Sequence, residues 1–73
     1  MYKYYMTQRG FSIGAQPMKN LVDHGDYDCK TTVLPGVAAW SWLKYSEPLT
    51  DAEIAAYELE PDPDNPNAAL SFN

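Results

Sequence analysis

The sequence predicts a small α+β domain, in which one short helix packs on a three-stranded antiparallel sheet, with a fourth strand if residues 18–34 split into two. Three observations support this class. Residues 37–45, VAAWSWLKY, alternate strictly in side-chain character, which is typical of a strand with two different faces. Residues 49–53, LTDAE, carry a complete helix-start signal. Gly- and Pro-containing turn residues separate the remaining apolar segments.

The first strand is expected over residues 2–9, YKYYMTQR, with Tyr2, Tyr4 and Met6 on one face. Gly10 ends it. Residues 11–17, FSIGAQP, show no sustained period, so they are expected to form a loop. We expect Phe11 and Ile13 of this loop to turn back into the core.

Residues 18–34 are expected to form two short strands, 18–23 and 29–34, joined by a turn. The turn is assigned to HGDYD, because glycine readily adopts positive φ and aspartate bonds its own backbone. Pro35-Gly36 is a second turn signal, and it leads into the strand 37–45.

The strand 37–45 raises the main architectural question. Ala39, Ser41, Leu43 and Tyr45 share one face, while Trp40, Trp42 and Lys44 share the other. One helix covers only one face of a small sheet. Either it covers the tryptophans, which then form the core, or it covers the face of small residues and leaves an aromatic pair typical of an interface.

The helix is expected over residues 51–58. Thr50 is a good N-cap, and Glu53 follows at the position that completes a capping box. Leu49 and Ile54 have the spacing of a hydrophobic staple. Pro61 is expected to stop the helix. Residues 1–60 are therefore predicted to be a single domain, and residues 61–73, rich in Pro, Asp and Asn, an extended or disordered tail.

Composition limits the classes of function. The chain has 73 residues and one cysteine, Cys29, so an intramolecular disulfide is excluded. The start of the chain lacks the apolar region of a signal peptide, and no segment has the length of a membrane span, so a soluble, cytoplasmic protein is expected. No cofactor is expected.

The net charge of −5 is unevenly distributed. All five basic residues precede position 46, whereas seven of the ten acidic residues follow it. An acidic surface attracts basic partner surfaces and repels phosphate backbones, which makes nucleic acid an unfavoured partner. An alternative is that the acids only keep an aromatic-rich chain soluble. The candidate partner-binding acids are Asp51, Glu53, Glu58, Glu60, Asp62 and Asp64.

Little in the sequence indicates catalysis. Residues 23–29, DHGDYDC, contain five potential metal ligands, but their spacing matches neither an EF-hand nor a zinc motif, so a polar turn is favoured. Cys29 and His24 could approach each other across that turn, yet nothing orients them as a nucleophile and base. We therefore expect a protein that is not an enzyme and binds no metal.

One aromatic and basic combination is also present. Lys3, Arg9 and Lys44 interleave with Tyr5 and Trp42 on faces that could belong to one sheet surface. Such a surface can bind single-stranded nucleic acid by stacking. The alternative is that the lysine stems simply cover the aromatic rings.

Three segments together resemble a known group of proteins: YKYYMTQRG at the start, a Pro-Gly turn before AAWSWLKY, and PLTDAEIAAYEL. They are similar to short uncharacterised proteins of phages and mobile elements of gut Firmicutes, over most of residues 2–59. The resemblance identifies no catalytic or binding residues. It implies a mobile-element context, in which small acidic proteins often inhibit host defence systems such as CRISPR or restriction.

The function predicted from these observations is non-enzymatic. The first hypothesis is a protein-binding module, an anti-defence inhibitor whose acids occupy the basic surface of a host or defence-system protein. The second is a self-associating structural protein, a homodimer that uses the face of Trp40 and Trp42. The third is a single-stranded nucleic-acid binder.

Overall fold

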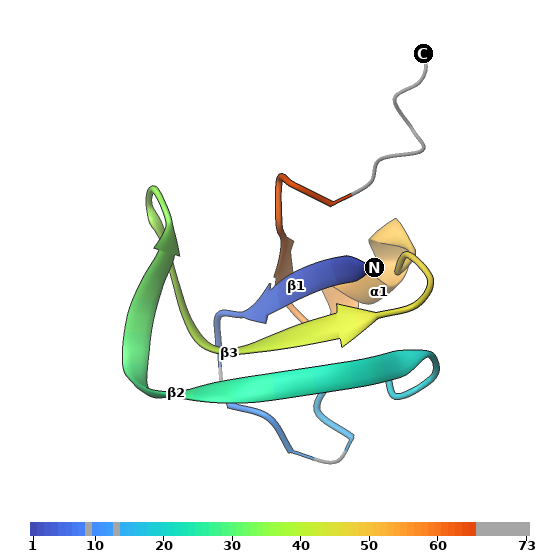
Figure 1. The fold of residues 1–73 in the computed structure, drawn as a ribbon, viewed down its shortest axis with the longest axis horizontal. Helices are drawn as coiled ribbons and strands as arrows, with labels where there is room; N and C mark the ends of the chain where they lie inside the picture. Colours follow the sequence, from blue (N-terminus) through green and yellow to red (C-terminus); the bar gives the residue numbers. More distant parts are fainter. Residues whose placement is uncertain (9, 13, 66–73) are drawn as a thin grey trace.

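The computed structural model describes residues 1–8, 10–12 and 14–65. Five elements follow one another along the chain: β1 (Tyr2–Met6), β2 (Leu21–Leu34), β3 (Val37–Tyr45), α1 (Asp51–Ala56) and β4 (Leu59–Pro61). The strands form one antiparallel sheet in the order β2-β3-β1-β4, and α1 lies on it near the end of β3 (Figure 1). The predicted α+β class is confirmed.

The core lies on one face of the two central strands, β1 and β3. Their register pairs Tyr4 with Leu43 and Met6 with Ser41, so that alternate side chains of both strands point the same way. The buried cluster on this core face consists of Tyr4, Met6, Leu43, Tyr45 and Leu59. Two aromatic rings of the cluster, Tyr4 and Tyr45, meet edge to face with centroids 5.7 Å apart.

The helix covers this core face and not the tryptophans. Ile54 and Tyr57, from α1 and its end, pack against the buried cluster. The small side chains of Ala39 and Ser41, on the same side of β3 as Leu43, are fully buried. Of the two arrangements that the sequence left open, the one with tryptophans as the core is wrong. Phe11 also packs here, as predicted, while Ile13 lies outside the described residues.

The predicted start of the helix is confirmed in atomic detail. The Thr50 hydroxyl accepts a hydrogen bond from the Glu53 amide at 3.1 Å, and the Glu53 carboxylate accepts one from the Thr50 amide at 2.9 Å. The helix ends at Ala56, two residues before the predicted end. It stops because Glu58 adopts a left-handed φ of 55°, which turns the chain into β4 well before Pro61.

The prediction of two strands with a turn at HGDYD is wrong. Residues 21–34 form one long strand, β2, which continues through Gly25 without positive φ. The glycine is used for space rather than for a turn: a Cβ at this position would lie 2.6 and 2.7 Å from the Cε2 and Cζ2 atoms of Trp42. The register against β3 shifts between Asp26 and Thr31, and there the hairpin bends sharply (Figure 1).

The fourth strand comes from the segment after the helix and not from a split of residues 18–34. Leu59, 6% exposed, pairs with Met6, and Pro61 pairs with Tyr4. Proline lacks an amide donor and therefore suits this edge position. The sequence predicts that Pro61 belongs to an extended or disordered tail, but in the structure it is the last residue of β4. Residues 66–73 of the predicted tail lie outside the described residues.

Residues 62–65 continue along the edge of β1. The Asn65 side chain accepts a hydrogen bond from the Lys3 amide at 2.6 Å and donates one to the Lys3 carbonyl at 2.9 Å. The Asp62 amide donates to the same carbonyl at 3.0 Å. A side-chain amide thus bonds both backbone groups of Lys3, as a strand partner would.

Within the part of the chain that the structure describes, the single helix has six residues, and no helix is long and apolar enough to cross a membrane.

Candidate functional site

The face of the sheet opposite the core, called here the outer face, carries charged and aromatic side chains. Strand pairing places them in rows across the sheet. Lys44 of β3 lies between Asp23 of β2 and Lys3 of β1. The next row contains, in order across the four strands, Gly25, Trp42, Tyr5 and Glu60. The sequence-based grouping of Lys3 and Lys44 with Tyr5 and Trp42 on one surface is therefore correct, and Arg9 lies outside the described residues.

Trp42 is the centre of the outer face. Its indole lies against the backbone of Gly25, which has no side chain to hold it away. The ammonium group of Lys3 lies 5.3 Å from the indole centroid, and that of Lys44 lies 5.7 Å from it. Both distances are within the range of a cation–π interaction. The lysines thus partly cover the indole, as the alternative interpretation of the sequence proposed.

Tyr5 is fixed beside Trp42 by a carboxylate. Its hydroxyl donates a hydrogen bond of 2.6 Å to Asp62, and the Lys3 ammonium lies 5.4 Å from its ring. Burial, and then the bond to Asp62, raise the pKa of Tyr5. The same bond, the amide of Asp64 and the charge of Lys3 lower the pKa of Asp62. The carboxylate is therefore charged and engaged with its own chain at neutral pH.

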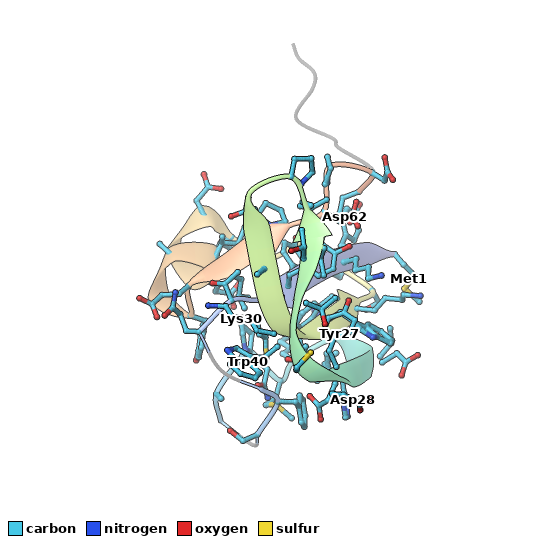
Figure 2. All side chains as sticks on the ribbon, turned by 90° about the vertical axis from the view of Figure 1, so that its left-hand side faces the viewer. Met1, Tyr27, Asp28, Lys30, Trp40 and Asp62 are labelled. Atoms are coloured by element: carbon cyan, nitrogen blue, oxygen red, sulfur yellow. The ribbon has the colours of Figure 1, made fainter. Side chains whose placement is uncertain are left out.

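The two tryptophans have different surroundings. Trp40 lies at the bend of the hairpin, opposite the register shift of β2, and is 37% exposed. Figure 2 shows Trp40 and Lys30 on one side of the bent hairpin and Tyr27 on the other. Burial raises the pKa of Tyr27, whose charge would also act on Tyr5. Tyr27 is thus half-buried within electrostatic reach of Tyr5, whereas Trp40 is an exposed ring.

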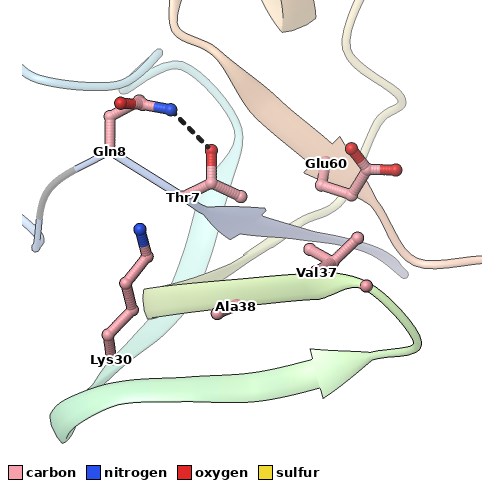
Figure 3. Close-up of a pocket in the computed structure, with 7 residues that line it drawn as sticks. Thr7, Gln8, Lys30, Val37, Ala38 and Glu60 are labelled. Carbon is pink, nitrogen blue, oxygen red and sulfur yellow. Dashed lines mark hydrogen bonds between the residues drawn. The ribbon is translucent and has the colours of Figure 1, made fainter.

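A shallow hollow lies between the bent hairpin and the end of β1. Its volume is about 370 Å³. Thr7 and Gln8 form one side, Lys30 and Ala38 form the other, and Glu60 stands at the far end (Figure 3). Because the lining is mostly polar and open to solvent, the hollow lacks the enclosed apolar walls of a typical small-molecule site.

The six predicted acids are all at the α1 and β4 side of the sheet, but they are not equivalent. Glu53 is used in the capping box, and Asp62 holds Tyr5 and the Asp64 amide. The other four form what we call the acidic edge: Asp51, Glu58, Glu60 and Asp64. Of these, Glu60 is half-buried and the rest are exposed.

The residues considered for metal binding or catalysis are spread along β2. The ring of His24 stacks on Phe11 with centroids 3.7 Å apart, and exposed Cys29 lies further along the same strand. No group of three or more potential ligands is placed to hold a metal among residues 1–8, 10–12 and 14–65.

Two positions that sequence reasoning missed organise the outer face. Gly25 makes room for the indole, and the signal for it was present: a glycine inside an otherwise alternating segment, with tryptophans on a neighbouring strand. Asn65 holds the backbone of Lys3, but an asparagine among prolines and aspartates predicts a turn and gives no sign of its partner.

These features define a small, single-helix α+β domain whose charged and aromatic side chains lie on open surfaces. The protein family described as "Defence against restriction A C-terminal" matches residues 1–64. The chain belongs to this family, which places it with anti-restriction proteins of the kind that phages and mobile elements carry. The search of curated proteins found no match. No solved structure matched either.

Proposed function

We propose that this protein is a non-enzymatic, protein-binding module that counteracts restriction by occupying a basic, DNA-binding surface of a restriction enzyme with its acidic edge. The family match over residues 1–64 is the observation that carries the anti-restriction part of the proposal. Its partner is a cytoplasmic protein of the bacterial host.

The acidic edge supports the electrostatic part. Asp51, Glu58 and Asp64 are exposed, and Glu60 is half-buried beside them on β4. A surface that carries several acids and few bases attracts a basic partner surface. Glu53 and Asp62 serve the fold instead, so they are poor positions at which to test binding.

A restriction assay in cells tests the proposal. Unmodified and modified plasmids are transformed into a panel of restricting hosts with and without the protein. We expect the wild-type protein to raise transformation by unmodified DNA in at least one host, with no change for modified DNA. No relief in any host of the panel would contradict the anti-restriction function.

Two charge-matched variants test the surface. The first carries Glu58→Asn, Glu60→Gln and Asp64→Asn; asparagine at position 58 tolerates the left-handed backbone. The second carries Asp23→Asn, Asp28→Asn and Glu47→Gln, which removes the same number of charges elsewhere. We expect the first variant to lose relief of restriction and the second to keep it. Equal effects of both would mean that net charge matters and that the acidic edge does not.

A second candidate function is self-association through the aromatic face, favoured by the exposure of Trp40. Sedimentation of the wild type and of Trp40→Ala over a range of concentrations tests it. A concentration-dependent dimer that Trp40→Ala abolishes supports this function, and a monomer throughout opposes it.

A further inference from the structure

The outer face contains a pair of lysines in an arrangement that the fold does not need. Lys3 and Lys44 are direct cross-strand partners on the two central strands. Like charges placed directly opposite each other destabilise a sheet. A lysine and a neutral side chain would cover Trp42 equally well, so the second ammonium group is unexplained by packing.

The two charges converge on one place. Both ammonium groups lie within cation–π distance of the same indole, at 5.3 and 5.7 Å. The contact with Gly25 fixes the indole from below, and half-buried Lys3 and Lys44 reach solvent above it. The result is an indole held against the sheet and flanked by two ammonium groups.

Two carboxylates, those of Asp62 and Asp23, lie near the lysines and are also hydrogen-bonded within the chain. Asp62 is beside Lys3, and it accepts hydrogen bonds from the Tyr5 hydroxyl and the Asp64 amide. Asp23 is opposite Lys44, and it accepts a hydrogen bond of 2.9 Å from the amide of His24. Both carboxylates keep their negative charge, and these hydrogen bonds fix their positions, so an incoming anion must compete with them for the lysine pair.

We propose that Lys3 and Lys44, together with Trp42, form a binding site for the phosphate group of a nucleotide, either free or within single-stranded nucleic acid. The two ammonium groups bind the phosphate oxygens as compact charges. The base stacks on the part of the indole that the lysines leave uncovered. The site is formed by residues other than those of the acidic edge, although Glu60 of that edge lies in the same row of the outer face as Trp42.

Trp42 fluorescence gives a direct measurement of the proposed site. The chain has two tryptophans, so the variant Trp40→Phe leaves Trp42 as its single reporter. Inorganic phosphate, a mononucleotide and an oligothymidine are titrated separately at low salt. We expect the mononucleotide and oligothymidine to quench Trp42 saturably. Tighter binding of the oligothymidine identifies the strand as the ligand, and equal binding identifies the free nucleotide.

Lysine variants in the Trp40→Phe background distinguish binding at the proposed site from a nonspecific effect of positive charge. Lys3→Gln and Lys44→Gln are each expected to lower affinity about fivefold, and to reduce the salt dependence of oligothymidine binding by about 0.7 in log–log slope. Lys19→Gln removes the same charge from a turn elsewhere in the chain, and its affinity is expected to equal that of the Trp40→Phe parent. Lys44→Arg keeps the charge and should keep binding, which guards against a purely structural effect.

Three results would overturn the proposal. One is the absence of quenching by either nucleotide ligand at low salt. Another is an equal loss for Lys19→Gln and the two outer-face variants, which would indicate that the loss of any positive charge weakens binding, whatever its position. The third is competition by polyglutamate as effective as that by oligothymidine, because the surface would then recognise acidic peptides and not nucleotides.

Discussion

The two faces of the sheet are built from the same strands but stabilised in different ways. On the core face, Leu43 and Tyr45 are fully buried among apolar and aromatic neighbours. On the outer face, Trp42 is packed between a glycine backbone and two lysines. Alternate residues of one strand, β3, thus contribute to a buried core on one face and to a charged surface on the other. The substitutions below test this difference, from the largest expected effect to the smallest.

Leu43→Ala should cause the largest loss. It removes a fully buried side chain from the core face, which typically costs about 3 kcal/mol through lost burial and the cavity left behind. A domain of 73 residues has a total stability of about 4–11 kcal/mol, so about 1–8 kcal/mol would remain and the variant should unfold at a much lower urea concentration than the wild type. Urea unfolding followed by circular dichroism measures it. A loss below about 1 kcal/mol would show that the site collapses and is not a packed core.

Gly25→Ala should be the most damaging change on the outer face, with a loss of about 2 kcal/mol. The added methyl group would overlap the indole ring, which has no flexible end that could move away. The same substitution in a Trp42→Ala background should be neutral or stabilising, because the obstacle is gone and alanine restricts the unfolded chain. Urea unfolding of the four proteins of this cycle gives the coupling. Equal costs in both backgrounds would contradict the close contact.

Tyr5→Phe should cost about 1 kcal/mol at neutral pH, because it removes a hydrogen bond to a charged carboxylate but keeps the ring. The effect depends on pH. Folding lowers the pKa of Asp62 below its ordinary value of 3.8, so its contribution is complete above that value and is lost as pH falls through the folded pKa. Denaturant unfolding in acid should therefore find the two proteins closer in stability. A difference that does not change with pH would mean that the bond to Asp62 is not its source.

At high pH the two faces should behave alike. Burial raises the pKa of Tyr5 on the outer face and of Tyr45 on the core face. A raised pKa in the folded chain means that stability is complete below the ordinary value of 10.0 and is lost as pH rises through the folded pKa. Tyrosinate absorbance and circular dichroism, recorded together, should show late ionisation of these tyrosines accompanied by unfolding. Ionisation at the ordinary pH without unfolding would contradict their burial.

Lys44→Gln should have the smallest effect, within about 0.5 kcal/mol. The lost cation–π contact and the relieved repulsion with Lys3 have opposite signs and similar size. Thermal unfolding at low and high salt measures the balance. A clear stabilisation that disappears at high salt would show that repulsion dominates, whereas a large loss would place Lys44 among the residues that stabilise the fold.

The parts of the fold that were predictable are those with local causes. The helix start at Thr50 depends on groups three residues apart, so the sequence predicts the complete capping box, and the structure confirms it. The two faces of β3 follow from strict alternation, but the face that the helix covers depends on the packing of distant segments. The turn at Gly25 was predicted wrongly because glycine suits both positive φ and close approach, and only the opposite indole decides between them.

The candidate site followed the same rule. Strand alternation placed Lys44 beside Trp42, and the pairing of β1 with β3 then brought in Lys3 and Tyr5. The sequence shows how many acids lie near the end of the chain, but it does not show which of them hydrogen-bond within the fold and which are exposed. Only the structure distinguishes Asp62, which holds Tyr5, from exposed Asp64, because the partner is 57 residues away along the chain. Two residues this far apart in the sequence form no local pattern from which their contact could be predicted.

The bonds from Asn65 to Lys3 have a practical consequence for anyone who expresses or fuses this domain. A boundary placed at residue 60, where the apolar pattern stops, would leave the amide and carbonyl of Lys3 open at a strand edge. Open edges of this kind recruit strands from other molecules and promote aggregation. The hydrogen bonds along this edge extend through residue 65, so a linker should be attached beyond that position.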